Sequence, residues 1–426
     1  MFFLEKKIRR ALGLALAFCL AMSASFPAAA DTAKNNLITA GSSLDAGPGA
    51  SAELRGVWIS YLDWLKFPSD EAGFEKAVDQ VLDRCVELNM NAVFVHVRAD
   101  ADAMYPSDYF PWSRFITGTQ GLDPGYDPLD YFVEAAHDRD LQFHAWINPL
   151  RVTGYRNRWD YVSEDNPAKI WLTDSSTHND RWVLKQGGEY YFNPAVPEVR
   201  ELIVSGVREV VDMYDIDGVH FDDYFYPEVD DSSRDKWFDK PEYDRSGSSL
   251  SIADWRRENI NTLIQAVYEA VHESREEAVF GISPEGYIDN LRSDTRLFTD
   301  VDTWMTQPGY VDYIMPQLYW GFEHRLADGS LAPYAFENNL RTWVGLRQEG
   351  GERVTLYLGL AMYKAGSGTK DNNAVPEWLR RSDIIKRQVE AGRKSGAVAG
   401  YCFYSYSSFQ DADCQEEVEN LMKVLK

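Results

Sequence analysis

Positive charge is scarce in this sequence. The 426 residues include 43 Lys and Arg against 67 Asp and Glu, which gives a formal net charge of −24 at pH 7. A surface of this sign repels phosphate backbones and anionic lipids, so nucleic acid is not expected as a partner and tight docking on a membrane is disfavoured. With 45% hydrophobic and 26% charged residues, the composition is that of a folded globular protein and not of a disordered chain.

Cysteine is also rare, and motifs for common cofactors are missing. Cys19 lies in an apolar N-terminal run, which leaves Cys85, Cys402 and Cys414. Three cysteines cannot all pair within one chain. Cys85 and Cys402 lie in apolar patterns typical of buried thiols, and a Cys402–Cys414 disulfide is the alternative. The sequence has no CxxC or HxH pair and no Gly-rich phosphate loop after the first strand, so we predict no cofactor and no metal.

No apolar run is long enough for a comfortable membrane span. The candidate run, residues 11–22, follows basic residues within positions 6–10 and precedes small residues at 28–30. This order is typical of a secretory signal peptide, and an uncleaved anchor is the alternative. We predict a signal peptide over 1–30 and a flexible leader over 31–52. The protein is then expected outside the cell, in the cell wall or in the periplasm.

From residue 53 onward, short β-rich runs alternate with longer amphipathic runs. The expected strands are 54–61, 92–98, 142–148, 218–222, 279–283, 313–319, 355–361 and 399–404. The expected helices are 72–89, 128–138, 197–213, 252–273, 299–308, 335–347, 381–395 and 414–425. Eight strands, each followed by a helix, predict an α/β fold: one (β/α)8 TIM barrel over 53–426, with long βα loops on its C-terminal face.

The loops after the second, third and fourth strands are long and rich in aromatic residues. In a barrel of this type, the loops that follow the strands form the active-site face. The chain has 13 Trp and 24 Tyr, and flat rings with a polar edge suit a cleft that stacks on sugars. Trp112 and Tyr224 are candidates for such contacts; for any single ring, packing within the loop is the alternative.

Two adjacent carboxylates end the fourth predicted strand, in the segment DGVHFDDYFYP (217–227). Side chains alternate along a strand, so Asp222 is expected to point into the barrel mouth, with His220 one layer below it and Asp223 turned toward a neighbouring loop. Like charges this close disfavour joint ionisation, so the pKa of one carboxyl should rise. Both aspartates are catalytic candidates, and capping of loop backbone is the alternative.

A third acidic candidate, Glu285, follows the fifth strand in FGISPEG (280–286). It is expected at the same rim as Asp222. Glycosidase carboxylates stand roughly 5–5.5 Å apart for retention of configuration and roughly 6.5–9.5 Å apart for inversion, and the sequence does not decide between them. The alternative for Glu285 is a surface carboxylate beside a tight turn.

Polar residues occupy inward positions on other strands, where a barrel interior normally holds Val, Ile and Leu. Buried polar groups need partners, so structural hydrogen bonds explain some of them and a substrate-positioning ring explains the rest. The candidates for substrate binding are His96, Arg98, Asp100, His144, Trp146, Asn148, His220, Gln317, Tyr319 and Trp320.

Two competing chemistries use other residues. His96, His144, His220 and Asp222 would form a metal site if they converged on one ion, although His220 is expected below the rim. A serine nucleophile is disfavoured, because the sequence has no GxSxG motif and Ser283, which precedes a proline, has no evident base.

At these motifs the sequence resembles the glycosyl-hydrolase-like ten family of secreted bacterial proteins. The matching stretches are ELRGVWIS (53–60), VRADADAMYPSDYFPWS (97–113), GLDPGYDPLDYFVEAAHDRDLQFHAWINPLRV (121–152), YFNPAVPEVRELI (191–203), DGVHFDDYFYP (217–227), FGISPEG (280–286), VDYIMPQLYWGF (311–322) and LYLGLAMYK (356–364). The resemblance implies a glycosidase-type barrel, and some members of the family cut peptidoglycan glycan strands. Asp222 and Asp223 match its strand-four motif, whereas many relatives carry Phe or Asp at the position of Glu285.

The sequence therefore predicts a secreted glycoside hydrolase that acts on a cell-wall polysaccharide, with peptidoglycan glycan as the expected partner. In this hypothesis Asp222 is the nucleophile or electrostatic stabiliser and Glu285 the general acid. Asp223, Arg98, Asn148, Gln317 and Tyr319 would hold sugar substituents, and Trp112, Trp146 and Trp320 would stack on rings. A non-catalytic glycan-binding barrel and a metal-dependent polysaccharide hydrolase or deacetylase are the alternatives.

Overall fold

The computed structural model describes residues 53–154, 159–186, 188–223, 225–227, 239–367 and 377–426. The predicted signal peptide, the predicted leader and Tyr224 lie outside these residues. Among the helices that it does describe, none has both the length and the apolar character needed to cross a bilayer.

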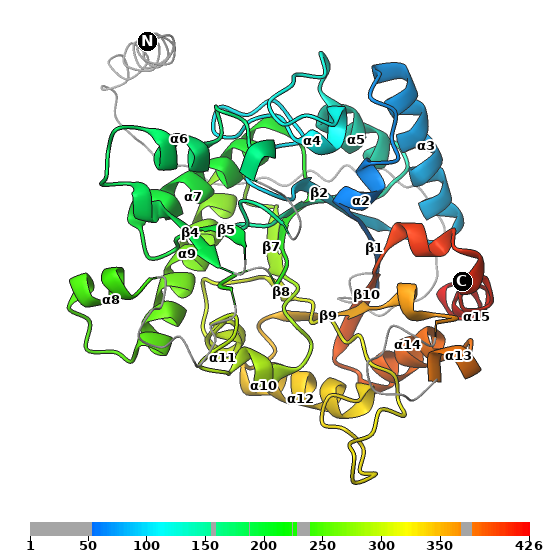
Figure 1. The fold of residues 1–426 in the computed structure, drawn as a ribbon. Helices are drawn as coiled ribbons and strands as arrows, with labels where there is room; N and C mark the ends of the chain where they lie inside the picture. Colours follow the sequence, from blue (N-terminus) through cyan, green and yellow to red (C-terminus); the bar gives the residue numbers. More distant parts are fainter. Residues whose placement is uncertain (1–52, 155–158, 187, 224, 228–238, 368–376) are drawn as a thin grey trace, which may run out of the picture. The chain divides into compact units, whose positions relative to one another are not determined.

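Eight parallel strands close into a barrel, in the order β1-β10-β9-β8-β7-β6-β3-β2. They form the centre of the view in Figure 1, with the helices arranged around them. The strands are β1 (Leu54–Ile59), β2 (Ala92–Arg98), β3 (Gln142–Ile147), β6 (Gly218–Phe221), β7 (Val279–Ile282), β8 (Tyr313–Ile314), β9 (Thr355–Leu360) and β10 (Val398–Phe403). The predicted (β/α)8 fold is confirmed.

The sixth barrel strand, β8, is shorter than predicted. It ends at Ile314, and Pro316, which has no backbone N–H to donate to the ladder, follows almost at once. Gln317 restores single bridges to Glu285 on one side and Gly359 on the other. The barrel wall therefore continues to the mouth as isolated bridges rather than as a regular strand.

The outer layer consists of amphipathic helices close to the predicted bounds. They are α3 (Glu71–Glu87), α5 (Pro128–His137), α7 (Pro197–Met213), α9 (Ile252–Ser274), α11 (Val301–Thr306), α12 (Phe336–Glu349), α14 (Ile384–Ser395) and α15 (Gln415–Leu425). Local signals explain where they begin: Asp127 caps α5 ahead of Pro128, and the Ser251 hydroxyl accepts the Asp254 N–H at the start of α9.

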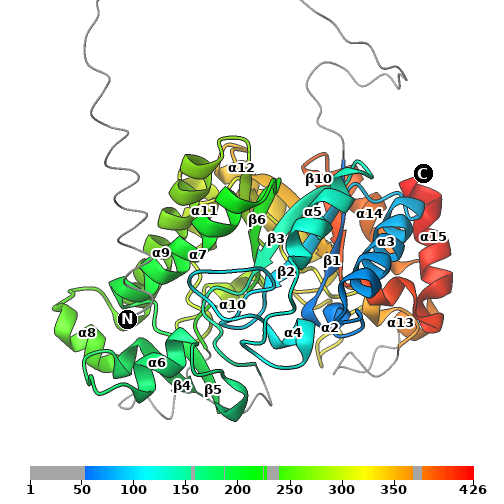
Figure 2. The same ribbon diagram turned by 90° about the horizontal axis from the view of Figure 1, so that it is seen from above.

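Short elements that the sequence did not predict build the loops that follow the strands. They are α2 (Tyr61–Trp64), α4 (Arg114–Thr117), α6 (Pro167–Thr173), the two-stranded sheet of β4 (Val183–Gln186) and β5 (Glu189–Phe192), α8 (Lys240–Ser246), α10 (Ile288–Leu291) and α13 (Glu377–Arg380). In Figure 2 most of them gather at one end of the barrel, the end at which the strands terminate. This end carries the long loops that the sequence predicted.

Aromatic and small residues fill the barrel interior in a complementary way. The interior cluster consists of Leu54, Trp58, Ala92, Phe94, Trp146, Tyr313, Met315 and Cys402. A Cβ at Gly281 would lie 2.2 Å from the Tyr313 ring, and one at Gly218 would lie 2.6 Å from His144 Nδ1. Glycines at these positions therefore make room for large inward side chains on neighbouring strands.

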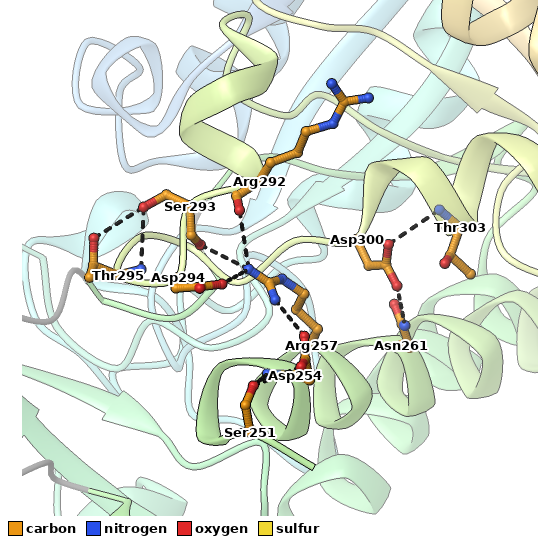
Figure 3. Close-up of polar contacts among 10 residues, drawn as sticks. All are labelled: Ser251, Asp254, Arg257, Asn261, Arg292, Ser293, Asp294, Thr295, Asp300 and Thr303. Atoms are coloured by element: carbon orange, nitrogen blue, oxygen red, sulfur yellow. Dashed lines mark hydrogen bonds and ion pairs between the residues drawn. The ribbon is translucent and has the colours of Figure 1, made fainter.

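A polar network connects α9 to the segment that runs from α10 to α11 (Figure 3). The Arg257 guanidinium donates to Asp254 and Asp294 and also reaches backbone carbonyls of that segment. Asn261 donates to Asp300 at 2.9 Å, and Asp300 accepts the Thr303 N–H at the start of α11. These bonds hold the chain that follows β7, and with it the loop that carries Glu285.

The three cysteines of the barrel, Cys85, Cys402 and Cys414, are buried free thiols. Burial raises the pKa of Cys85 to about 12. The expectation that Cys85 and Cys402 serve as small buried hydrophobic residues is confirmed, and Cys402 and Cys414 do not form a bridge.

Candidate active site

A cavity of about 200 Å³ opens at the C-terminal end of the barrel. Its walls combine aromatic rings with carboxyl, hydroxyl, amide, imidazole and guanidinium groups. The lining residues are Trp58, Tyr61, His96, Trp146, Arg151, Asp222, Asp223, Ser283, Gln317, Tyr319 and Tyr404. Seven strands or the loops directly after them contribute to this one cavity, which is where barrel enzymes place their catalytic groups.

Asp222 is the most buried carboxylate of the cavity, with 2% of its surface exposed. It is the first residue after β6, and it points into the mouth as the strand alternation predicted. The indole Nε1 of Trp146 donates to its Oδ2 at 3.1 Å. This bond fixes the orientation of the carboxylate within the cavity.

Asp223 lines the cavity as well, and its side chain contacts Gln317 of the segment after β8, which fits the predicted turn toward a neighbouring loop. Strict alternation no longer applies, because β6 ends at Phe221 and the chain leaves the sheet. Burial raises the pKa of Asp223 to about 6; the charge of Glu285 adds to this rise, while Gln317 and Arg151 oppose it. The prediction that one carboxyl of this pair has a raised pKa is thus matched at Asp223.

Glu285 lies beside the cavity and is not one of its lining residues. Asn290 donates to its Oε1, and Arg296 lies 3.6 Å from its Oε2. Its side chain is 19% exposed. The predicted rim position on the strand next to Asp222 is correct, and the residue is close enough to act on Asp223 through its charge.

The predicted inward direction of Arg98 is wrong. The β2–β3 register shifts between His96, which pairs with Trp146, and Arg98, which pairs with Ile147. This irregularity reverses the parity of the strand end and turns Arg98 outward. Its guanidinium stacks over the Phe110 ring at 4.3 Å and leaves no room for a Cβ at Gly206 of α7.

Several other predicted binding residues lie outside the cavity lining. His144 stacks on Phe94 in a deeper layer, with centroids 4.4 Å apart. His220 is fully buried beneath the cavity. Asn148 donates to the carbonyl of Ala99 at 2.9 Å.

Asp100 and two predicted stacking rings also lie outside the cavity lining. Asp100 forms an ion pair with Arg151 at 3.1 Å. Trp112 packs against the hydrophobic core, and Trp320 contacts Tyr334 with centroids 5.5 Å apart. Of the predicted binding residues that the structure describes, His96, Trp146, Gln317 and Tyr319 do line the cavity.

Five lining residues were not among the predicted site residues: Trp58, Tyr61, Arg151, Ser283 and Tyr404. Trp58 and Tyr404 had a usable signal, because they are aromatic residues at inward positions near the ends of the first and last strands. Trp58 contacts Tyr404 edge-on, with centroids 6.1 Å apart. Tyr61 and Arg151 lie beyond strand ends, where no periodic pattern predicts whether a side chain points into the barrel mouth.

Ser283, which the sequence analysis set aside for want of a base, has a histidine partner. Its Oγ lies 2.9 Å from His220 Nε2. Burial holds the pKa of His220 well below its ordinary value, and Trp58 Nε1 donates to the same Nε2 at 3.2 Å. His220 is therefore a shared acceptor in a buried network rather than an accessible base.

The histidines considered for a metal site do not converge. His96 lines the cavity, His220 lies beneath it, and His144 stacks on Phe94 lower in the barrel. Across the described part of the chain, no group of three or more His, Cys, Asp or Glu side chains is arranged to hold an ion.

A (β/α)8 barrel with carboxylates and aromatic rings around a C-terminal cavity fits the glycoside hydrolase class, whose members use paired carboxylates. The chain belongs to the Glycosyl hydrolase-like 10 family, whose sequence model matches residues 53–379. This confirms the family resemblance found in the sequence motifs.

Two relatives cover most of the chain. The chain is 35% identical over 379 residues to the glycosyl hydrolase YngK of Bacillus subtilis. The aligned region covers 84% of this chain and 69% of that protein. The chain is 32% identical over 403 residues to the glycosyl hydrolase DigH of Escherichia coli K12. The aligned region covers 87% of each protein.

Solved structures show the same fold at low identity. The PgaB (BpsB) glycoside hydrolase domain from Bordetella bronchiseptica has a TM-score of 0.56 at 16% identity and covers 87% of this chain and 99% of that one. The endo-1,4-beta-mannanase from Rhizomucor miehei has a TM-score of 0.51 at 13% identity, with coverage of 90% and 96%. Function must then be argued from the site.

Proposed function

We propose that this protein is a secreted glycoside hydrolase that cleaves glycosidic bonds of a cell-wall-type polysaccharide, with peptidoglycan glycan strands as the first candidate substrate. The observation that carries the proposal is the joint presence of Asp222 and Asp223 in one aromatic-walled cavity at the C-terminal end of the barrel. The family membership supports the hydrolase class. The choice of peptidoglycan rests on the family resemblance described above.

The two carboxyl groups have environments that suit different roles. Asp222 is held by the Trp146 indole and faces the cavity as an acceptor, which suits a carboxylate that stabilises or attacks an oxocarbenium-like anomeric centre. Asp223 has a pKa of about 6, so it retains a proton in mildly acidic conditions. It can donate that proton to the departing glycosidic oxygen; water then adds its hydroxyl to the anomeric carbon and returns its other proton to the Asp223 carboxylate.

This assignment revises the hypothesis that Glu285 is the general acid. Glu285 is bound to Asn290 and Arg296 and lies outside the cavity lining, whereas Asp223 lines the cavity directly. The role proposed for Glu285 is to raise the pKa of Asp223 through its negative charge.

The aromatic walls explain how a sugar ring would be held. The Tyr319 and Tyr404 rings are inclined by 28° with centroids 6.2 Å apart, and Trp58 meets Tyr404 edge-on. The cavity is smaller than the roughly 300–1,000 Å³ of drug-sized ligand pockets, so it fits a single ring of a longer glycan. The remainder of the strand would run over the loops at this end of the barrel.

The test is to incubate the purified protein with glycan strands that carry or lack stem peptides, and to detect new reducing ends by mass spectrometry. Asp222→Asn should reduce turnover at least about a hundredfold, because it removes the negative charge that faces the reacting centre. Asp217→Asn is the matched control: Asp217 directly precedes the same strand, binds the Phe143 N–H and lies outside the cavity lining.

Each outcome has a defined meaning. Shortened strands made by the wild type and the Asp217 variant, but not by the Asp222 variant, support the proposal. Acetate release without shorter strands would replace it with a deacetylase. Binding without any product would replace it with a non-catalytic glycan-binding barrel.

A further inference from the structure

A second cavity, of about 640 Å³, shares no lining residue with the mouth cavity around Asp222. Its walls come from residues 177–182, from residues 195–198 at the start of α7, from α8 and from the first turns of α9. In Figure 2, α6, α8, β4 and β5 lie at the end of the barrel that carries the active-site loops. The volume falls within the roughly 300–1,000 Å³ of ligand-binding cavities, a range that the mouth cavity does not reach.

Two indole rings line this second cavity. Trp182 is partly buried and meets Trp171 edge-on, with centroids 4.9 Å apart. Trp255 is 7% exposed and meets Tyr243 edge-on, with centroids 5.4 Å apart. These contacts fix the orientation of both rings. Flat aromatic faces that are already held in place offer a stacking surface to a sugar ring at a low entropic cost.

Paired charges accompany these rings. Arg181 donates two hydrogen bonds to Glu242, from Nε at 2.6 Å and from Nη2 at 2.8 Å, and Arg245 lies 3.7 Å from the same carboxylate. The Arg181 and Arg245 side chains are 40% and 71% exposed. Glu198 completes the lining carboxylates, so two guanidinium groups are matched by two acids. The second cavity therefore does not share the repulsion that a net charge of −24 exerts on acidic polymers, and its lining does not have the excess of positive charge typical of a phosphate site.

The loop after β3 connects the two cavities. Arg151, which lines the mouth cavity, forms an isolated antiparallel bridge with Tyr191 of β5. β5 pairs with β4, which begins directly after Trp182. The Asn193 N–H donates to the Trp182 carbonyl at 2.8 Å, and the Asn193 side-chain amide donates to the Arg181 carbonyl at 3.0 Å. These bonds hold the second cavity at a fixed position relative to the mouth cavity.

We propose that the second cavity is a binding site for the polysaccharide chain, separate from the site of cleavage, which retains the polymer while the mouth cavity acts on one of its bonds. The inference rests on the proposed function for the identity of the polymer. Trp182 and Trp255 would stack on sugar rings. The Arg181–Glu242 pair would exchange hydrogen bonds with hydroxyl groups, because it places donors and acceptors side by side. A polymer bound there has a raised effective concentration at the mouth cavity.

The first measurement compares the kinetics on long peptide-free glycan strands with those on peptide-free tetrasaccharides. Trp182→Ala should raise KM for the long strands by roughly tenfold with kcat unchanged, because it removes a binding surface remote from the reacting bond. For the tetrasaccharides, KM should change by less than about twofold, because a short chain gains nothing from a second site. Arg245→Ala, at a mostly exposed side chain whose loss does not endanger folding, should raise KM for the long strands by about two- to threefold.

Two matched controls come from the same surface. Trp159 is a partly buried indole in the loop after β3 that packs on Tyr190, and it lies outside the lining of both cavities. Arg208 is an exposed guanidinium that pairs with Glu273 at 2.9 Å, also outside both linings. Trp159→Ala and Arg208→Ala should leave KM for the long strands unchanged. An equal rise of KM for long strands and tetrasaccharides in Trp182→Ala, or the same rise in Trp159→Ala, would overturn the inference.

Binding without turnover separates this inference from the proposed function. In nitrogen-15 NMR of the wild type and of Asp222→Asn, the Trp182 indole N–H signal, assigned by its absence from Trp182→Phe, should shift when glycan strands are added. Strands that bind through Trp182 but are not cleaved by the wild type would support the inference and refute the proposed function. Efficient cleavage with no shift of this signal would refute the inference alone. A shift with inorganic phosphate but not with glycan strands would show an anion site and would also overturn it.

Discussion

Two pairs of neighbouring aspartates follow strands of this barrel. One pair lines the cavity and the other does not. Asp222 and Asp223 follow β6, whereas Asp100 and Asp102 follow β2. Burial raises the pKa of Asp223 to about 6 and that of Asp102 to about 7. Judged by pKa alone, Asp102 would be the better catalytic candidate.

The difference between the pairs is access. Asp102 is fully buried and accepts a hydrogen bond from Gln120 at 2.9 Å, and Asp100 pairs with Arg151 at 3.1 Å. The Asp102–Gln120 bond lies within the loop after β2, and the Asp100–Arg151 pair joins that loop to the one after β3, where Arg151 borders the cavity. A perturbed pKa therefore marks a functional group only where a substrate can reach it.

The largest expected effect is that of Asp223→Asn. If Asp223 donates the proton, the substitution should lower kcat by about 10²–10⁴-fold. The wild-type kcat/KM should fall as the pH rises through about 6, because the donor loses its proton there. The variant should lack this limb, which a pH profile of strand cleavage measures. A variant with wild-type rate at pH 5 would exclude Asp223 as the acid.

A second prediction concerns stability at the pair outside the cavity. The pKa of Asp102 is raised from ~3.9 in the unfolded chain to about 7 in the folded protein, so its contribution to stability is full below pH ~4 and is lost as the pH rises through about 7. Asp102→Asn cannot ionise and should be more stable than the wild type at pH 8 by ~1–3 kcal/mol, with little difference near pH 4.

Urea unfolding at both pH values tests this prediction, with turnover of glycan strands as the companion measurement. Retained turnover together with increased stability at pH 8 would sharpen the contrast between the two pairs. Lost turnover in a stably folded Asp102→Asn protein would contradict this contrast, because the pair outside the cavity would then take part in the reaction.

The smallest effect is expected from Glu285→Gln. Removal of this charge should lower the pKa of Asp223, so the fall in activity should move to lower pH by roughly half a unit to one unit. At pH 5 the rate should stay within about threefold of wild type, since the proton donor remains. A loss of about 10²-fold or more at every pH would instead identify Glu285 as the acid.

The local sequence pattern was enough to predict the architecture and the site residues Asp222 and Trp146. The alternation of β-rich and amphipathic runs predicted all eight barrel strands and the eight helices of the outer layer, because the period of buried side chains differs between strand and helix. Parity along β6 placed Asp222 in the mouth, and Trp146 was found by the same argument on β3. Both residues lie within or directly beside regular strand, where alternation holds.

Prediction failed where the backbone departs from a regular strand. The register irregularity after His96 turned Arg98 outward. This irregularity leaves no periodic signal in the sequence. Arg151 was missed for a related reason, since it follows a strand end and reaches the cavity through its pairing with Asp100.

The sequence by itself determined the barrel and the presence of acidic groups at its C-terminal rim. These follow from residue type and spacing along the chain, which act locally. Only the tertiary structure decided which carboxyl groups share a cavity and which buried acid pairs with an arginine. Those properties depend on contacts between strands far apart in sequence, such as Tyr61 with His96 and His220 with Ser283, and closure of the barrel creates them.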